Sequence, residues 1–538
     1  MSRSLFGVET EYAVTSFDAD GGRVDRAQTV QHLKTAAAAL FAHAPDLYGS
    51  GVFLSNGSRF YIDCGLHPEL ATPECTNPTD LVRYVLAGGQ TMLRLAAYVR
   101  DTHVRGGCVS VFRCNVDYSG SGSTWGCHES YLHRADSAVL APQIVPHLVT
   151  RIIFTGAGGF APRSPGLELS LSPRVSHIVL EKSTESTADR GIFHTKNEPL
   201  CGGGYRRLHV LCGDSACSEL SMWLKIGTTA LVVLLIEAGV APGESVRLRQ
   251  PVLAMKTVAG DLDCGAPLTL KTGAPARAVD IQRHYLEAAE SRLGEPFMPA
   301  WADDVCRVWR ATLDQIDHDR ASLTRRFDWA VKSPLYKHYA QQRGFSWLDV
   351  TNWTRALAMR PATVHGSGRD AGLQELPKGA ESASTAGGEP EPALTRHLRE
   401  HGLSPDDLPA FVALRSELFE IDTRFGELGD GGVFTALDRS GALAHHVPGV
   451  GRVQEAVTQP PAEGRAALRG AVIARMDRTG PYVCDWPWLW DRKARRALDL
   501  SDPFEVEERW KEVSTEAVAT SGGGPFIRLA QALQDLLR

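Results

Sequence analysis

The first residues of this sequence that could do chemistry are two glutamates near its start. Glu9 and Glu11 lie two residues apart in the segment FGVETEYAV. Side chains alternate between the faces of a β-strand, so both carboxylates would share one face, about 7 Å apart, while Phe6 and Val8 would face a core. Two carboxylates on one face repel each other unless a cation lies between them, and Mg²⁺ is a suitable cation. The alternative is a solvated strand face that carries two charges.

A second segment adds a guanidinium group, a phenol and more carboxylates. In RFYID, Arg59, Tyr61 and Asp63 would share one strand face. An arginine on that face could contact phosphate through paired hydrogen bonds. His67 and Glu69 follow directly, in a predicted loop that Gly65 and Pro68 would shape. A single histidine is more often structural than catalytic, but packing alone does not explain the whole group.

Two later segments contain further candidate site residues. In GCHESYL, His128 and Glu129 are adjacent, so on a regular element they would point in opposite directions. In YRRLHV, Arg207 and His209 would share a strand face, and a salt-bridged surface strand is the alternative interpretation. The motifs GxxxxGK[ST] and HExxH do not occur, which disfavours a P-loop and a zinc protease.

The elements that must position these residues are mixed strands and helices. Strand-like segments are predicted at 4–16, 51–63, 108–117, 150–155 and 206–212. Helix-like segments are predicted at 28–43, 79–103, 216–239, 278–293 and 302–322, and Asn77 or Thr79 could cap the second of them. Because single helices do not regularly separate the strands, the pattern favours an α+β fold with an antiparallel sheet over a doubly wound parallel one.

Length and composition fit a folded enzyme with a small additional domain. The chain has 538 residues and a formal net charge of −6, which favours neither nucleic acid nor an acidic membrane as a partner. We predict a catalytic domain at 1–360, a flexible low-complexity insertion at 361–410 and a small C-terminal domain at 411–538. The longest aliphatic run is short for a membrane span, the start does not resemble a signal peptide, and the cysteines form no CxxC pair. We therefore expect a cytoplasmic protein.

These segments, in their order, resemble the Pup ligase and depupylase family. The similar stretches are GVETEY, NGSRFYIDCGLHPELATPEC, GCHESYL, YRRLHVLCGDS, LKIGTTALV and, after the insertion, QPPAEGRAALRG and VCDWPWLW. The family is the proteasome accessory factor A group of carboxylate–amine ligases, related in fold to glutamine synthetase. The resemblance implies a curved antiparallel sheet with helices packed on one face, and a small C-terminal domain that contributes to the nucleotide site.

The resemblance also implies ATP and Mg²⁺ as cofactors and gives roles to matching positions. The positions expected to bind Mg²⁺ are Glu9, Tyr61 and Glu69, with Glu11 as a further candidate. The positions expected to bind ATP are Arg59, Thr72 and Trp486, with Arg207 as a further candidate. Asp63 would be the catalytic base. His128 and Glu129 are additional site candidates.

The activity implied by the resemblance is isopeptide ligation. The γ-phosphate of ATP would pass to a glutamate side chain of a Pup-like small protein, and a lysine of a protein target would then attack the acyl phosphate. One alternative is a depupylase or deamidase-type amide hydrolase, and a second is a non-catalytic nucleotide-binding regulator. The connection from Ser16 to Gly51 has no room for the long loop of depupylases, which favours ligation. The loop KNEPLC at 196–201 departs from the family pattern, which suggests a divergent member.

Overall fold

A nine-stranded sheet forms the centre of the computed structural model, which describes residues 4–184, 188–194, 198, 200–359, 393–477 and 480–513. The strand order is β11-β12-β13-β8-β1-β6-β5-β4-β3. These strands are β1 (Phe6–Glu11), β3 (His43–Pro45), β4 (Gly51–Leu54), β5 (Arg59–Asp63), β6 (His67–Ala71), β8 (Cys127–His133), β11 (Ile178–Ser183), β12 (Arg190–His194) and β13 (Arg206–Val210). Neighbouring strands are antiparallel, but β11 and β12 pair in parallel, so the sheet is mixed and the fully antiparallel prediction is wrong at this edge.

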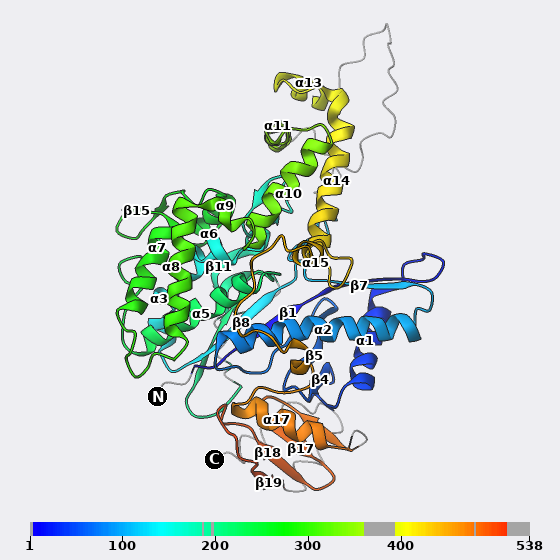
Figure 1. Cartoon of the computed structure of the whole chain (residues 1–538), viewed down its shortest axis with the longest axis vertical. Coiled ribbons are helices and arrows are strands. Elements are labelled where there is room, and N and C mark those ends of the chain that lie inside the picture. The colour runs from blue at the N-terminus through cyan, green and yellow to red at the C-terminus, as the bar shows by residue number, and fades with distance from the viewer. Residues whose placement is uncertain are drawn as a thin grey trace.

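Helices cover one face of the sheet and form the main core with it. The central helices are α2 (Pro78–Thr102), which packs on β1, and α5 (Glu219–Glu237), which packs on β8. The surrounding helices are α1 (Arg26–Leu40), α3 (Ser137–Thr150), α4 (Ile152–Thr155), α6 (Pro251–Gly260), α7 (Ala278–Glu290), α8 (Ala302–His318) and α9 (Arg320–Leu323). Figure 1 shows α3, α5, α7 and α8 gathered at one end of the sheet. Helix α5 is long and apolar enough to cross a membrane, but its apolar window is wholly buried, as in a core helix.

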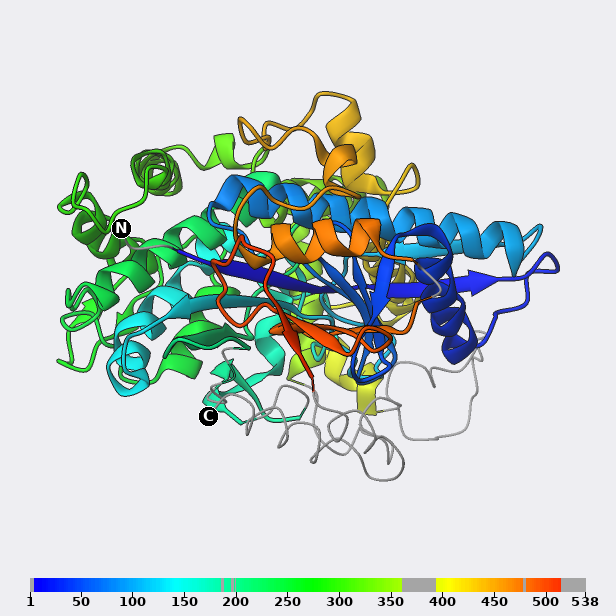
Figure 2. The same ribbon diagram turned by 90° about the horizontal axis from the view of Figure 1, so that it is seen from below.

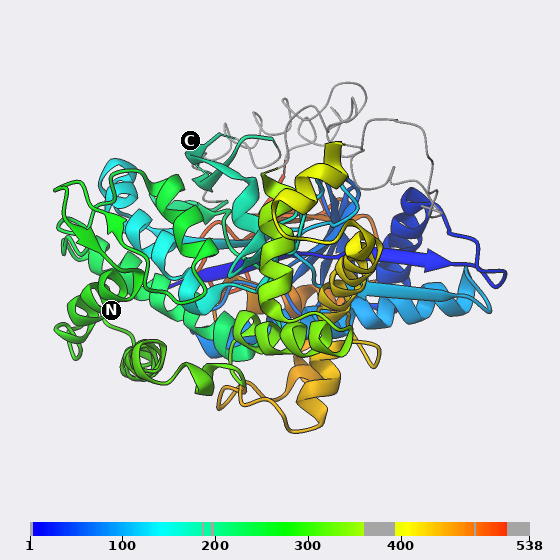
Figure 3. The ribbon, with the colours of Figure 1, turned by 90° about the horizontal axis from the view of Figure 1, so that it is seen from above.

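A helical arm rises away from the sheet. It consists of α10 (Asp328–Gln342), α11 (Trp347–Ala358), α13 (Ala393–Glu400) and α14 (Leu408–Phe425). Trp353 of α11 stacks on Phe411 of α14 with ring centroids 5.2 Å apart. Seen from above, the arm lies over the central strands (Figure 3). Residues 360–392, most of the predicted flexible insertion, lie outside the described residues, whereas 393–410 form α13, the 3-10 helix η3 (Pro405–Asp407) and the start of α14.

A small C-terminal unit lies at the opposite end of the molecule from the arm (Figure 1). After α15 (Val433–Arg439) and α16 (Val453–Ala456), it contains α17 (Gly464–Arg475) and a sheet of β16 (Tyr482–Cys484), β17 (Trp488–Asp491), β18 (Arg496–Asp499) and β19 (Trp510–Glu512). Figure 2 shows α17 and this sheet, in orange and red, in front of the central strands. Ala44 and Phe53 of the large sheet share a hydrophobic cluster with Leu489 and Leu498. The unit is therefore attached to the β3–β4 edge.

The remaining short elements lie in the connections between the larger helices and strands. They are β2 (Ala13–Phe17) paired with β7 (Cys108–Phe112), β9 (Gly159–Phe160) with β10 (Leu169–Ser170), β14 (Leu268–Thr269) with β15 (Pro275–Ala276), and the 3-10 helix η1 (Pro173–His177).

The predicted helices are confirmed, whereas several of the strand predictions differ from the structure. Each of the five predicted helices coincides with a helix of the structure, and Asn77 caps α2 by accepting a hydrogen bond from the Asp80 amide at 2.8 Å. The strand predicted at 150–155 is wrong, because these residues end α3 and form α4. A short buried apolar run does not distinguish strand from helix by periodicity. Strands β3, β6, β8, β11 and β12 of the large sheet were not predicted, and the loop predicted at His67 and Glu69 is strand β6.

Candidate functional site

Strand register brings most of the predicted site residues onto one face of the sheet. Glu11 lies opposite Glu69 across β1 and β6, and Tyr61 lies opposite Glu69 across β5 and β6. Asp63 lies opposite His67 in the same pair of strands. The alternate residues of these strands are buried under the helices, so the face predicted from period-two alternation exists.

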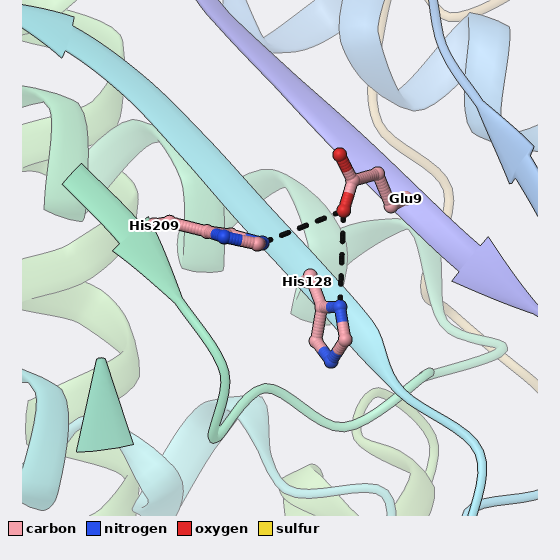
Figure 4. A group of neighbouring side chains, drawn as sticks. All are labelled: Glu9, His128 and His209. Atoms are coloured by element: carbon pink, nitrogen blue, oxygen red, sulfur yellow. Dashed lines mark ion pairs between the residues drawn. The ribbon is translucent and has the colours of Figure 1, made fainter. Parts of the chain in front are cut away.

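Two histidines lie beside Glu9 (Figure 4). One Glu9 oxygen is 3.8 Å from His128 Nδ1 and 3.4 Å from His209 Nε2. Arg207 donates to His209 Nδ1 at 2.8 Å, so a neutral His209 presents its Nε2–H to Glu9. Burial opposes the charge of Glu9, but these two histidines outweigh burial and hold the pKa of Glu9 well below its usual value. Glu9 is therefore an anion near neutral pH.

Glu11, Asp63 and Glu69 form a second acidic group. Their carboxylate oxygens lie within 4.8 Å of one another. The pKa of Glu69 is raised well above its usual value. Burial is the largest cause, and the negative charges of Glu9, Glu11 and Asp63 add to it. One Glu69 oxygen, Oε1, is buried and has no hydrogen-bond partner among the described residues. Crowded oxygen ligands with an unsatisfied buried oxygen fit a hard divalent cation such as Mg²⁺.

Asp63 has a setting suited to a proton acceptor. It is half-buried, and burial, with the nearby Glu11 charge, raises its pKa. His67 bonds to Glu11 at 2.6 Å and stacks on Trp125 with ring centroids 5.3 Å apart. His67 and Trp125 also line a cavity of about 540 Å³, which gives this side of the sheet room for a substrate. A carboxylate with a raised pKa is a better general base for chemistry near neutral pH.

A separate cavity lies near Glu9 and is lined by Thr72, Arg207 and Trp486, three of the residues predicted to bind ATP. Its volume is about 80 Å³. Thr72 accepts a hydrogen bond from the Val8 amide at 3.1 Å, so its position is fixed by β1. Trp486 comes from the C-terminal unit, and the cavity therefore forms between the two parts of the chain.

Arg59, the fourth residue predicted to bind ATP, makes contacts within the protein. Its guanidinium donates to Asp46 at 2.7 Å and to Ser50 at 3.0 Å. The guanidinium carbon also lies 4.2 Å from the centre of the Tyr61 ring. Arg59 is thus next to the acidic face but is neutralised by Asp46 in this arrangement.

Glu129 belongs to the opposite face of the sheet, so its inclusion among the site candidates is wrong. It is buried under the helices, where its carboxylate bonds to Arg151 at 2.6 and 2.8 Å. It also accepts a hydrogen bond from the Tyr131 hydroxyl at 2.6 Å. Adjacent strand residues point to opposite faces, which places His128 in the site and Glu129 in the core.

Sequence reasoning missed two arginines that contact the site. Arg174 of η1 donates to His128 Nε2 at 3.3 Å and to Thr124 at 2.7 Å. Arg465 of α17 lines the cavity with Trp486. Each arginine reaches residues that are distant from it in the sequence, and residue spacing does not predict which distant residues come into contact.

Comparison with known proteins gives the family. A family described as Pup-ligase protein matches residues 4–360 and 394–489. The chain belongs to the Pup ligase family. A Pup–protein ligase of Sanguibacter keddieii is 33% identical over 519 residues, which cover 94% of this chain and 98% of that protein. A Pup–protein ligase of Mycobacterium avium is 30% identical over 527 residues, covering 95% of this chain and 99% of that protein.

Solved structures agree with this family. The Pup ligase PafA in complex with ADP is 27% identical, with a TM-score of 0.64, and the match covers 85% of this chain and 88% of that one. A complex between Pup and its ligase PafA has a TM-score of 0.71 at 24% identity, covering 99% of this chain and 94% of that one. The second likeness supports the α+β fold.

Proposed function

We propose that this protein is an ATP-dependent ligase that joins a glutamate side chain of a Pup-like small protein to lysines of target proteins. The observation that carries this proposal is the acidic sheet face, which ends at a cavity lined by Thr72 and Trp486, in a chain of the Pup ligase family. The ADP complex of the relative PafA supports the use of an adenine nucleotide. The free cysteines of the described chain support a cytoplasmic setting.

The proposed metal ligands are Glu9, Glu11, Tyr61 and Glu69. When bound, Mg²⁺ screens the charge of the phosphates and so favours their attack by an anion. Thr72 and Trp486 hold the nucleotide, and Arg207 adds a positive charge at the same cavity. The unsatisfied oxygen of Glu69 supports this assignment, because a buried oxygen without a partner is costly unless a ligand satisfies it.

Asp63 acts as the base in the second half of the proposed reaction. The carboxylate of the small protein first takes the γ-phosphoryl group and ADP leaves. The lysine amine then attacks the carbonyl carbon, phosphate leaves and an isopeptide bond forms. The attacking amine must be neutral, so its ammonium proton passes to Asp63, whose raised pKa suits this transfer.

An assay with purified components tests the proposal. The protein is incubated with ATP, MgCl₂, a Pup protein ending in glutamate and a lysine-bearing target, and mass spectrometry follows the products. ADP together with a Pup–lysine adduct is the expected result. A Pup variant ending in glutamine is the matched control and should give no adduct. Removal of Pup from a preformed conjugate without ligation would indicate a hydrolase, and nucleotide binding with neither reaction would indicate a regulator.

A further inference from the structure

A buried ion-pair cluster joins the C-terminal unit to the large sheet beside the nucleotide cavity. Glu74 lies two residues after Thr72. Its Oε1 accepts a hydrogen bond from Arg465 Nε at 2.6 Å, and its Oε2 accepts one from Arg469 Nη2 at 2.6 Å. The arginines follow Glu74 by 391 and 395 residues in the chain. We call Glu74, Arg465 and Arg469 the Glu74 clasp.

The charges of the clasp depend on one another. The side chain of Arg469 is 0% exposed and that of Arg465 is 4% exposed. Burial opposes the charge of Glu74, but Arg469 and Arg465 hold its pKa at about 2. Removing one partner of a buried ion pair leaves the other charge uncompensated, which is far more costly than losing an exposed pair. The two parts of the chain are therefore joined firmly at this point.

The clasp also contacts the walls of the nucleotide cavity. The guanidinium carbon of Arg469 lies 5.0 Å from the centre of the Trp486 ring, so one side chain both binds Glu74 and supports Trp486. Arg465 Nη1 donates to the carbonyls of Leu200 at 2.7 Å and of Leu500 at 3.1 Å. Glu74, Arg465, Thr72 and Trp486 all line the same cavity. The clasp thus fixes the two sides of this cavity against each other.

We propose that the Glu74 clasp positions Trp486 against Thr72, so that nucleotide binding is coupled to docking of the C-terminal unit on the large sheet. This inference rests on the proposed function because it takes an adenine nucleotide as the ligand of the cavity. Coupling between two equilibria is reciprocal, so the nucleotide must favour the docked unit as much as docking favours the nucleotide. The clasp residues are positioning residues, and their loss weakens nucleotide binding more than the chemical step.

The test compares Glu74→Gln with a control on α17, the helix that carries the two arginines of the clasp. Glu74→Gln removes the charge that holds both arginines, and we expect roughly tenfold weaker Mg–ADP binding by calorimetry and a similar rise in KM for ATP. The kcat at saturating ATP should stay within about threefold. Arg475→Met removes an exposed pair of α17 with Glu508, away from the cavity, and should leave all three values unchanged.

Hydrogen exchange gives a second readout that does not require activity. ADP should slow exchange in α17 and β16–β19 of the wild type, and this protection should be smaller in Glu74→Gln. If Glu74→Gln does not fold, Arg469→Lys keeps the charge, loses the planar guanidinium group and should show the same effects more weakly. ADP binding and protection that are unchanged in the folded variants would overturn the clasp proposal alone. A wild type that does not bind ADP would overturn the proposed function as well.

Discussion

Glu69 on β6 and Glu129 on β8 are both buried, but they face opposite sides of the same sheet. Glu129 is paired with Arg151 and the Tyr131 hydroxyl, and although burial opposes its charge, Arg151 and Lys225 lower its pKa. Glu69 has a raised pKa and an oxygen without a partner among the described residues. Glu129 is therefore satisfied within the protein, whereas Glu69 keeps an oxygen that the proposed metal would bind.

The largest effect is expected on the helix-covered face. Glu129→Gln should lower the free energy of unfolding by about 3–5 kcal/mol, because it leaves the buried Arg151 without a counter-charge. Urea denaturation measures the change. The double variant Glu129→Gln/Arg151→Met should recover part of the loss. A loss below about 1 kcal/mol, the range of exposed pairs, would contradict the contrast between the faces.

On the acidic face, the largest expected effect is on turnover. Asp63→Asn should lower kcat by roughly 10²-fold or more, since it removes the proposed proton acceptor, and should leave Mg–ADP affinity close to that of the wild type. Single-turnover formation of the adduct measures the chemical step. Asp101→Asn, which neutralises an exposed aspartate at the end of α2, is the control. Normal turnover by Asp63→Asn would remove Asp63 from the mechanism.

Glu69→Gln sharpens the comparison with Glu129→Gln. Without metal, the free energy of unfolding should change by less than about 1 kcal/mol or increase, because the variant relieves repulsion among like charges. Adding Mg²⁺ should raise the Tm of the wild type, and this rise should be smaller in Glu69→Gln. Differential scanning calorimetry with and without MgCl₂ measures both. A loss of stability as large as that of Glu129→Gln would mean that Glu69 is satisfied within the protein.

The smallest effect is expected at an exposed group that bridges two carboxylates. His446 contacts Glu219 at 2.9 Å and Asp438 at 3.1 Å, and the bond to Glu219 is the main cause of its raised pKa. Because the pKa of His446 is higher in the folded than in the unfolded protein, the protonated imidazole stabilises the fold. This contribution is fully present below pH 6.5, the usual pKa of histidine, and is lost as the pH rises through the raised pKa of the folded state. Comparing Tm of the wild type and His446→Gln from pH 6 to 9 should show a difference of at most about 2 °C that shrinks with pH. A difference that grows with pH would contradict the assignment.

The acidic face could be predicted because it depends on local geometry. Alternation places Glu9 with Glu11 on one face of β1 and Tyr61 with Asp63 on one face of β5, and the register through β6 puts both pairs on the same side of the sheet. The same rule separates His128 from Glu129, although only the structure shows which of the two faces the site. Five of the helices, α1, α2, α5, α7 and α8, were predicted because their apolar spacing is also local.

The missed features depend on contacts between distant segments. Arg465 and Arg469 reach Glu74 across nearly the whole chain, and Arg59 is bound by Asp46 on the β3 side of the sheet. The parallel pairing of β11 with β12 likewise depends on tertiary packing, which composition does not encode. The apolar run at 150–155 is helical. A buried strand would have the same apolar residues, so the sequence of this run does not distinguish the two structures.

The order in which the ribosome makes the chain gives the Glu74 clasp a consequence for biosynthesis. The strands that carry the acidic groups, β1, β5 and β6, end by Ala71, whereas the arginines that complete the clasp follow Glu74 by 391 and 395 residues. A chain that ends before Arg465 lacks one wall of the proposed nucleotide cavity, because Arg465 and Trp486 form that wall. The proposed nucleotide site is therefore complete only after most of the chain has been translated.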